Sequence, residues 1–281
     1  RIIPRLDIKG PNLVKGIHLE GLRVLGKPED FAKYYYHQGA DELIFQDTVA
    51  SLYDRNNLTD IIKRAAKNIF IPITVGGGLR ELGDINNVLR AGADKIAINT
   101  AAIKNPNFID EASRFFGSST IVIAIEALKQ QDKSYLAYTD NGREFTGINV
   151  LSWAKECEDR GAGEILLTSI DYEGTGSGFD LELIKLVTQS VSIPVIAHGG
   201  GANANHIKQV IDYGRADAVA ISSMLHYTII NNSKVFENNY NDEGNIEFLK
   251  KENVLFKNFG KYTIEFLKSE LTALDVKLRI L

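Results

Sequence analysis

Two carboxylates, Asp7 and Glu126, have the residue type and spacing that paired acid–base chemistry needs. Each ends an apolar, β-rich run, IIPRLDI for the first and TIVIAIE for the second. If these runs are opposite strands of one closed parallel sheet, both side chains enter the same mouth. Such a pair suits general acid–base catalysis, in which one group gives a proton while the other takes one. The alternative is that each forms a structural ion pair with a neighbouring lysine, Lys9 or Lys15.

Glycine-rich and hydroxyl-bearing turns indicate a second kind of chemistry, the binding of anions. A glycine turn that leads into a helix exposes backbone N–H groups and the positive end of the helix dipole, which favours phosphate. One such turn is weak evidence, because glycine often marks only a tight turn. Here two matched sets occur, and they predict a substrate with a phosphate at each end. The sets are Gly77, Gly78, Asn99 and Thr100, then Gly199, Gly200, Ser222 and Ser223.

Histidine and cysteine contribute less. His198 directly precedes the second glycine pair, where it either faces a ligand or is a hydrogen-bonded structural residue. The other histidines show no metal-ligand spacing, so no bound metal and no cofactor are predicted. Cys157 is the single cysteine, which excludes an internal disulfide and a multi-cysteine metal site. It lies in a helical pattern and is expected to be a buried structural thiol.

The turns belong to a long internal repeat. The segments GADELIFQD, IPITVGGG and AGADKIAINT are followed later by GAGEILLTSID, IPVIAHGG and GRADAVAISS in the same order. Solenoid repeats are much shorter, at roughly 20–50 residues. The repeat therefore predicts two fused half-domains, at about 1–117 and 118–281.

Eight short apolar runs alternate with amphipathic helical patterns. The runs are apolar on both faces, as is typical of parallel strands covered by helices. Eight βα units predict one α/β domain over 1–281, a (β/α)8 TIM barrel built from two half-barrels. A doubly wound open sheet is the competing fold, and it explains the half-to-half repeat less well. The predicted strands are 2–8, 42–47, 71–75, 95–99, 120–126, 164–170, 193–197 and 218–222.

Two segments interrupt this alternation. The stretch after Lys129 predicts a small β-hairpin with Asn141-Gly142 at its turn. Residues 228–258 form a polar, asparagine-rich insertion before the last helical pattern. Such an insertion is either a plain surface loop or a contact for a partner.

Charge and hydropathy exclude several classes of protein. The formal net charge is −4, which gives no broad attraction to nucleic acid or to an anionic membrane. No apolar run approaches the roughly 20 residues of a membrane span, and no signal-peptide pattern opens the sequence. These features predict a cytoplasmic protein with a small-molecule substrate.

Several motifs in combination resemble the cyclase subunit of imidazole glycerol phosphate synthase. They are RIIPRLDIK with LVKG, DELIFQD, TVGGG, GADKIAINTAA, FGSSTIVIAIEA and GAGEILLTSID. The resemblance runs from Arg1 to about Tyr227 and resumes in the last helix. It implies a lyase of histidine biosynthesis that accepts ammonia from a glutaminase subunit in a heterodimer. Its reaction converts a bis-phosphorylated ribulosyl nucleotide to imidazole glycerol phosphate and an aminoimidazole carboxamide nucleotide.

The resemblance also implies roles for residues at the expected mouth. Asp7 matches the first catalytic aspartate, a general acid. Lys15 matches the lysine of a flexible loop that closes over substrate. The remaining matched positions are Asp47 and Thr168 in the mouth, Gly78, Asn99 and Thr100 in one phosphate site, and Gly174, Gly200, Ser222 and Ser223 in the other.

At the opposite end of the barrel the resemblance implies a gate for ammonia. Arg1, Glu42, Lys95 and Glu164 match its ring of charges, and Asp94 matches a residue that contacts the glutaminase. As a bare pattern, four charges at strand starts would be solvated rim residues.

Three features depart from the family pattern. Glu126 stands where the family has its second catalytic aspartate, in a run like AIDAK. The longer side chain matters, because a misplacement of about 1 Å can slow a positioned reaction roughly a hundredfold. The 228–258 insertion and His198, where a smaller polar residue is usual, are the other two.

The departures resemble paralogues from bacterial surface-glycan clusters. That resemblance implies an alternative, an ammonia-channelling partner of a glutaminase and an amidotransferase that makes acetamidino sugars. The two phosphate sets favour the cyclase, whereas Glu126 and the insertion favour the conduit. A sugar-phosphate isomerase is a weaker third hypothesis, because the gate charges would then have no purpose.

Overall fold

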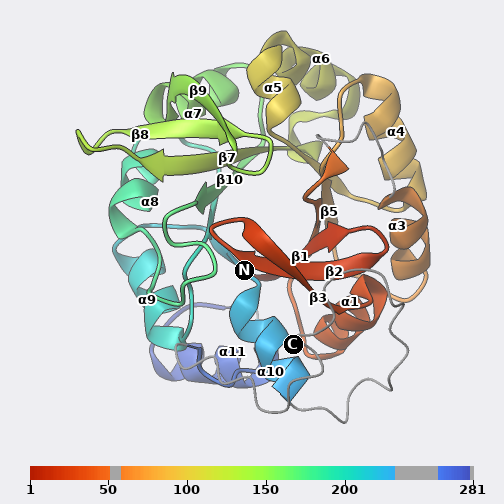
Figure 1. Ribbon diagram of the computed structural model, residues 1–281, viewed down its shortest axis with the longest axis vertical. Helices are drawn as coiled ribbons and strands as arrows, with labels where there is room; N and C mark the ends of the chain where they lie inside the picture. The colour runs from red at the N-terminus through yellow and green to blue at the C-terminus, as the bar shows by residue number, and fades with distance from the viewer. Residues whose placement is uncertain (51–57, 232–258, 279–281) are drawn as a thin grey trace.

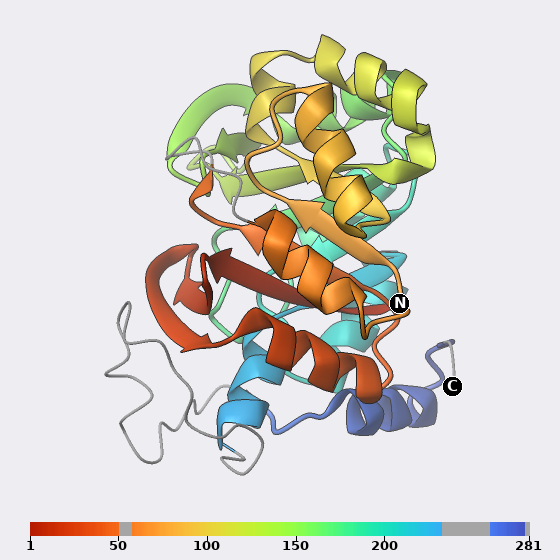
Figure 2. The ribbon, with the colours of Figure 1, turned by 90° about the vertical axis from the view of Figure 1, so that its right-hand side faces the viewer.

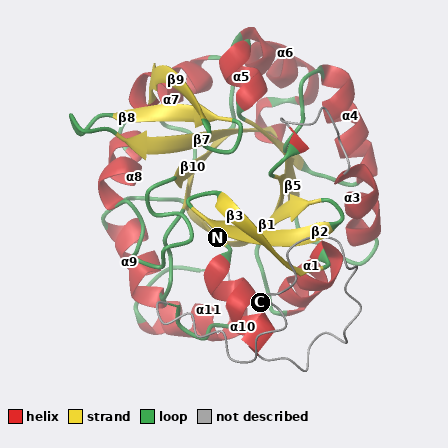
Figure 3. Ribbon diagram, viewed as in Figure 1, coloured by secondary structure: helices red, strands yellow, loops and turns green. Residues whose placement is uncertain are grey.

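Eight parallel strands close into a barrel in the computed structural model, which describes residues 1–50, 58–231 and 259–278 (Figures 1 and 3). Closure is direct, since β1 pairs with both β4 and β12 and Ile3 lies opposite Ala220. The predicted (β/α)8 barrel is confirmed, and the open sheet is wrong. The barrel strands are β1 (Ile2–Lys9), β4 (Leu43–Asp47), β5 (Ile73–Gly76), β6 (Lys95–Ile98), β7 (Ile121–Lys129), β10 (Glu164–Ser169), β11 (Val195–His198) and β12 (Ala218–Ile221).

Helices surround the barrel, and most of them have an apolar stripe at helical spacing that packs against the sheet. In α6, for example, Phe108, Ile109 and Ala112 are buried against the sheet. The helices are α1 (Pro28–His37), α3 (Leu58–Ala66), α4 (Leu82–Ala91), α5 (Thr100–Lys104), α6 (Asn107–Phe116), α7 (Val150–Asp159), α8 (Leu181–Thr188), α9 (Ala204–Asp212), α10 (Ser223–Asn231) and α11 (Ile264–Ala273). None of the helices in the described ranges is long and apolar enough to cross a membrane. Of the predicted 228–258 insertion, 228–231 end α10 and the rest lies outside the described residues.

Two antiparallel hairpins lie at the end of the barrel remote from the N-terminus (Figure 2). The β8–β9 hairpin (Tyr135–Thr139 and Glu144–Asn149) extends β7 and carries the predicted Asn141-Gly142 turn. The β2–β3 hairpin (Asn12–Ile17 and Glu20–Gly26) pairs with β1. The segment around Lys15 was expected to be a flexible loop, so its strand structure differs from the prediction.

The turn of the β2–β3 hairpin explains that difference. Its two central residues, His18 and Leu19, have φ angles of 53° and 63°. A two-residue turn with positive φ at both positions usually carries Asn, Asp or Gly. Because neither residue is of that kind, the sequence held no recognisable turn signal between the two strands.

Three aspartates make the same connection at the starts of barrel strands, here called the strand-start clamp. In each, the backbone N–H donates to the carbonyl of the residue that starts the preceding strand, and the carboxylate accepts that residue's own N–H. The carboxylate distances are 2.7, 2.8 and 2.9 Å for Asp41 with Ile2, Asp94 with Ile73 and Asp217 with Val195. The clamp explains why the repeat preserves an Ala-Asp pair before these strands.

The fourth equivalent position has only half of the clamp. Gly163 donates its N–H to Ile121 O at 2.9 Å but has no carboxylate. A Cβ atom there would lie 2.1 Å from the carbonyl oxygen of Ser118. Close backbone approach therefore excludes an aspartate at this one strand start.

The barrel interior is a packed apolar layer with polar side chains above it. The layer consists of Ile3, Ile44, Ala97, Val122, Leu166, Ile196, Ala218 and Ala220. Arg5 follows Ile3 on the inward face of β1, because alternate residues of a strand point the same way. Its buried guanidinium thus lies between the apolar layer and the mouth.

Candidate active site

Asp7 is held by two cations at the C-terminal end of β1. Arg5 Nε donates to Asp7 Oδ1 at 2.9 Å, and Lys15 Nζ donates to Oδ2 at 3.3 Å. All three side chains are buried. Burial alone would raise the pKa of Asp7, but the charges of Arg5 and Lys15 outweigh it and hold that pKa well below its usual range. The ion pair with Lys15 that the sequence left open is thus present.

Lys15 also joins the β2–β3 hairpin to the loop after β10. Its ammonium group forms a buried ion pair with Glu173, whose other carboxylate oxygen accepts the N–H of Leu19 at 2.9 Å. Asn141 Nδ2 donates to Leu19 O at 2.9 Å from the other hairpin. Glu173 therefore helps to keep the β2–β3 hairpin over the mouth. The sequence analysis missed it, although it directly precedes Gly174.

Glu126 ends the inward face of β7 in different surroundings. Its Oε2 accepts a hydrogen bond of 2.7 Å from the backbone N–H of Gly142, and 8% of the residue is exposed. Burial raises the pKa of Glu126 to about 7; Arg5 opposes the shift, while Asp140 and Asp7 add to it. Two carboxyl groups in one mouth thus have widely separated proton affinities.

Below Asp7, three side chains form a buried polar cluster. Arg5 Nη1 lies 3.1 Å from His198 Nδ1 and 3.3 Å from Thr168 Oγ1, and the latter two atoms are 3.1 Å apart. Burial, with the charges of Arg5 and Lys15, keeps the pKa of His198 well below its usual value. The imidazole is neutral, so its Nδ1 accepts from Arg5. His198 is thus hydrogen-bonded, and it also lines the second cavity described below.

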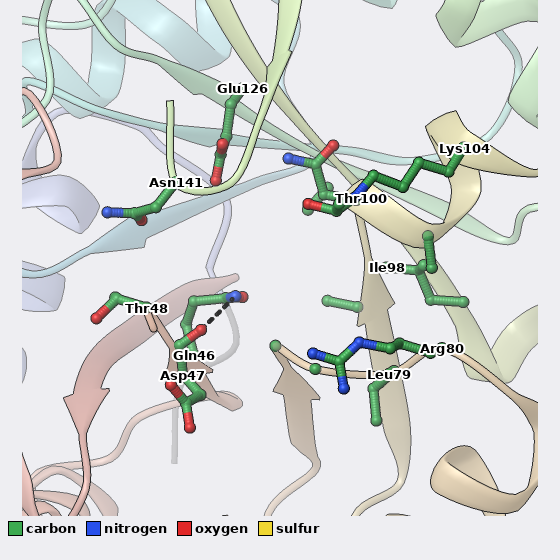
Figure 4. A pocket seen from close by; sticks show the side chains of 16 residues that line it. Gln46, Asp47, Thr48, Leu79, Arg80, Ile98, Thr100, Lys104, Glu126 and Asn141 are labelled. Carbon is green, nitrogen blue, oxygen red and sulfur yellow. Dashed lines mark hydrogen bonds between the residues drawn. The ribbon is translucent and has the colours of Figure 1, made fainter. Parts of the chain in front are cut away.

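The first cavity opens between β4, β5, β6 and β7 (Figure 4). Gly77 has φ +101°, and a Cβ atom there would lie 2.4 Å from Asp47 O, so only glycine fits this turn. Two basic side chains that the sequence analysis missed, Arg80 and Lys104, extend along the cavity in Figure 4. Of the predicted site residues, the cavity contains Asp47, Gly78, Asn99, Thr100 and Glu126.

Hydrogen bonds fix several members of this first cavity. Asp47 Oδ1 accepts the N–H groups of Val49 and Ala50, each at 2.9 Å. Asn99 Nδ2 donates to Tyr138 O at 3.1 Å. These residues are tied to loops and to the β8–β9 hairpin, so hydrogen bonds within the protein hold this wall of the cavity.

The second cavity lies across the mouth, beside β11 and β12. Gly200 has φ +96°, and a Cβ atom there would lie 1.8 Å from Gly178 O. Ser222 Oγ donates to Arg5 O at 2.9 Å, and the neighbouring Ser223 is also buried. No lysine or arginine is among the described residues that line it. The predicted members present are Gly174, Gly200, Ser222 and Ser223, with Glu173 and His198 beside them.

At the opposite end, four side chains form a closed ring of alternating charge. Arg1 Nη1 donates to Glu42 at 2.6 Å, and Nη2 pairs with Glu164. Lys95 Nζ completes the ring, at 3.2 Å from Glu42 and 3.1 Å from Glu164. The four predicted gate residues are thus in contact. Asp94 is engaged in a strand-start clamp beside them.

The remaining reactive groups lie away from the mouth. Cys157 is buried in α7, and burial raises the pKa of its thiol. Within the described ranges, no three His, Cys, Asp or Glu side chains are grouped so that they could hold a metal ion.

The fold and the site together define a (β/α)8-barrel protein with two glycine-lined cavities and a pair of buried carboxyl groups in one mouth. A family model described as "Histidine biosynthesis protein" matches residues 1–231. The chain belongs to this family, and within it to the cyclase (HisF) subunits of imidazole glycerol phosphate synthase.

Three relatives illustrate the similarity, each named "Imidazole glycerol phosphate synthase subunit HisF". The one from Legionella pneumophila is 62% identical over 200 residues, 71% of this chain and 94% of the relative. The one from Trichormus variabilis is 48% identical over 230 residues, covering 81% and 90%. The one from Methanocaldococcus jannaschii is 47% identical over 246 residues, also covering 81% and 90%.

Proposed function

We propose that this chain is a cyclase of histidine biosynthesis, a lyase that uses ammonia to form imidazole glycerol phosphate. The observation that carries the proposal is the geometry of one mouth, where two glycine-lined cavities flank Asp7 and Glu126. A ligand with a phosphate at each end fits this arrangement. Each cavity contains a glycine turn, and because glycine has no side chain the backbone N–H groups can come close to a phosphate. The identity of 62% over 94% of a HisF subunit supports the same activity.

In the proposed reaction a bis-phosphorylated ribulosyl nucleotide spans the two cavities. The first phosphate lies against Gly78 and Thr100, and the second against Gly200 and Ser223. Ammonia adds to the ketone carbon of the ribulosyl part, and water leaves as the imine forms. The new nitrogen then closes the imidazole ring on the carbon that bridges the two parts of the substrate, and the bond from this carbon to the amino nitrogen of the aminoimidazole carboxamide nucleotide breaks, which releases that nucleotide. Asp7 and Glu126 lie between the cavities, where charge and protons must move.

We further propose that ammonia comes from a separate glutaminase subunit docked at the ring of charges, with Asp94 at the contact. The name of the relatives, which are called subunits, supports a partner. The ring of Arg1, Glu42, Lys95 and Glu164 surrounds the barrel axis at the end remote from the cavities. We also propose one domain over 1–281 and a cytoplasmic location.

The alternative role in sugar amidination is not favoured, because relatives at 46–62% identity bear the HisF name. Both cavities have the glycine turns that substrate binding would need.

A steady-state assay with the bis-phosphorylated intermediate and an ammonium salt tests the proposal. We expect turnover by the wild type and a loss of about 100-fold or more in kcat for Asp7→Asn. Glu126→Asp shortens the side chain by one methylene and is expected to retain the carboxyl chemistry at a lower rate. Absence of turnover by the folded wild type would overturn the cyclase assignment.

A further inference from the structure

We propose that Arg5 is a positioning residue that keeps Asp7 a permanent carboxylate, so that of the two mouth carboxyls Glu126 is the one that exchanges a proton. The inference rests on the proposed function and refines its mechanism. It departs from the expectation that Asp7 is the general acid.

Both oxygens of Asp7 are already engaged by cations. Arg5 Nε occupies one at 2.9 Å and Lys15 Nζ the other at 3.3 Å. Protonation would remove the negative charge with which these cations pair, and in a buried site this leaves a cation without its partner. Asp7 is thus unsuited to donate a proton, because the carboxylate form is the one that pairs with both cations.

The two cations are not equivalent. Lys15 belongs to the β2–β3 hairpin and divides its charge between Asp7 and Glu173. Arg5 belongs to the barrel strand that carries Asp7, and its guanidinium is fixed from below by Thr168 and His198. If the hairpin opens to admit substrate, Lys15 leaves with it while Arg5 stays. Arg5 therefore maintains the charge of Asp7 in both states of the hairpin.

The environment below the guanidinium strengthens this pair. The apolar layer that includes Ile3, Val122 and Leu166 excludes water from the barrel interior. Opposite charges attract more strongly where little solvent screens them. The neutral His198 provides an acceptor for Arg5 and adds no second charge to the interaction between Arg5 and Asp7.

Glu126 has the opposite environment. The charged groups that face it are Arg5 and Asp7 from β1 and Asp140 from the β8–β9 turn. Asp47, Arg80 and Lys104 line the same cavity as Glu126. Its direct partner is the neutral N–H of Gly142. This hydrogen bond stabilises the carboxylate less than a cation would, so the group can still take up a proton. With burial and two nearby carboxylates favouring the neutral form, both protonation states are accessible near neutral pH.

Infrared pH titration of the full chain without substrate tests the charge assignment directly. We expect a carboxylic-acid carbonyl band that titrates near neutral pH in the wild type and is absent from Glu126→Gln. Arg5→Gln should add a second titrating band, and this band should disappear again in the double variant with Asp7→Asn. Arg5→Lys keeps a cation beside Asp7 and should not add it.

A matched variant separates Arg5 from the other cation. Lys15→Met removes the charge on the hairpin and should leave Asp7 ionised, with no added band. The inference is overturned if the neutral-pH band persists in Glu126→Gln, or if Lys15→Met adds the Asp7 band while Arg5→Gln does not. These spectra need no turnover, so they can be interpreted even if the proposed reaction is wrong.

The kinetic counterpart is the pH profile of kcat at a fixed concentration of free ammonia. The wild type should show an ionisation near neutral pH that Glu126→Gln abolishes together with at least 100-fold of the rate. Arg5→Gln should displace that ionisation, and Arg5→Lys should restore it. A merely structural role for Arg5 would lower kcat without moving the profile, and that result would also overturn the inference.

Discussion

Asp7 and Glu126 are buried carboxyl groups on facing strands, yet their partners differ in kind. Asp7 forms ion pairs with Arg5 and Lys15, whereas Glu126 accepts a hydrogen bond from one backbone N–H group. A buried acid without a cation is a source of instability, because the folded protein must either hold a proton or bury a charge. Glu126 is therefore expected to lower the stability of the fold under the conditions in which it would be catalytically useful.

Replacement of Glu126 by glutamine should stabilise the protein in a pH-dependent way. The pKa of Glu126 is raised from 4.5 to about 7 on folding, so the folded state binds this proton more tightly than the unfolded state. Stability is then lost as pH rises from 4.5 through 7. We expect Glu126→Gln to gain up to about 3 kcal/mol in free energy of unfolding at pH 8 and almost none at pH 4.5.

Urea denaturation at the two pH values measures this difference. Glu144→Gln, on the exposed part of β9, is a matched control that should show no such pH dependence. An equal effect of Glu126→Gln at both pH values would contradict the raised pKa.

Part of this residue-level pattern could be predicted from the sequence. Alternation along IIPRLDI places Arg5 on the same face as Asp7, and the repeat places Glu126 across the mouth. The contacts of Arg5 with His198 and Thr168 could not be predicted, because they depend on the width of the closed barrel. Glu173 was missed for a similar reason, since its partners Lys15 and Leu19 belong to a distant hairpin.

At the level of elements, the glycine turns are the features that the sequence indicated best. Gly77 and Gly200 both have positive φ and both lie against a carbonyl oxygen from a neighbouring segment. The β2–β3 hairpin was the least predictable element. Its turn residues His18 and Leu19 adopt positive φ because Glu173 and Asn141 bind the backbone of this turn.

The substitution Gly200→Ala should damage the second cavity selectively. The new Cβ would lie 1.8 Å from Gly178 O, so the turn must move in addition to tolerating φ +96°. Gly117→Ala is the matched control, with φ +86° and no atom within 4 Å of the new Cβ. We expect about 1 kcal/mol of destabilisation for the control and 3 kcal/mol or more for Gly200→Ala.

Thermal unfolding of the two variants measures the difference, and the KM for the bis-phosphorylated substrate checks the functional part. KM should rise at least tenfold for Gly200→Ala and stay unchanged for Gly117→Ala, since Gly117 lies outside both cavities. Equal losses of stability would show that backbone strain alone matters and that the turn has room to move.

At the scale of the whole molecule, the two ends of the barrel carry different groups of polar side chains. The mouth contains the cavities and carboxyls, while the ring of charges occupies the other end of the same axis. The eight-stranded closure followed from the count of βα units, which is the most robust inference that the sequence allowed. The ring followed only from the family resemblance, because four charges at strand starts are equally compatible with a solvated rim.

Glu164→Gln tests the ring. It removes the ion pairs with Arg1 and Lys95 and leaves Glu42 to hold both cations. Because the pairs are partly exposed, we expect a loss of only about 1 kcal/mol in stability. The glutamine-dependent rate with a glutaminase partner should fall several-fold relative to the ammonium-dependent rate. Asp212→Asn, which breaks the exposed pair with Lys208, should change neither the stability nor the ratio of these two rates. An unaltered ratio for Glu164→Gln would contradict the gate.

The strand-start clamps also have a consequence for how the chain closes on itself. Asp94 and Asp217 reach partners only 21 and 22 residues away, whereas Ser222 and Arg5, across the junction of β12 and β1, are 217 residues apart. The entropy lost on closing a loop grows only with the logarithm of its length, by about 0.6 kcal/mol per doubling. The roughly tenfold longer loop therefore costs only about 2 kcal/mol more than a clamp. Once the local units are clamped, joining the two ends of the barrel is a small further step.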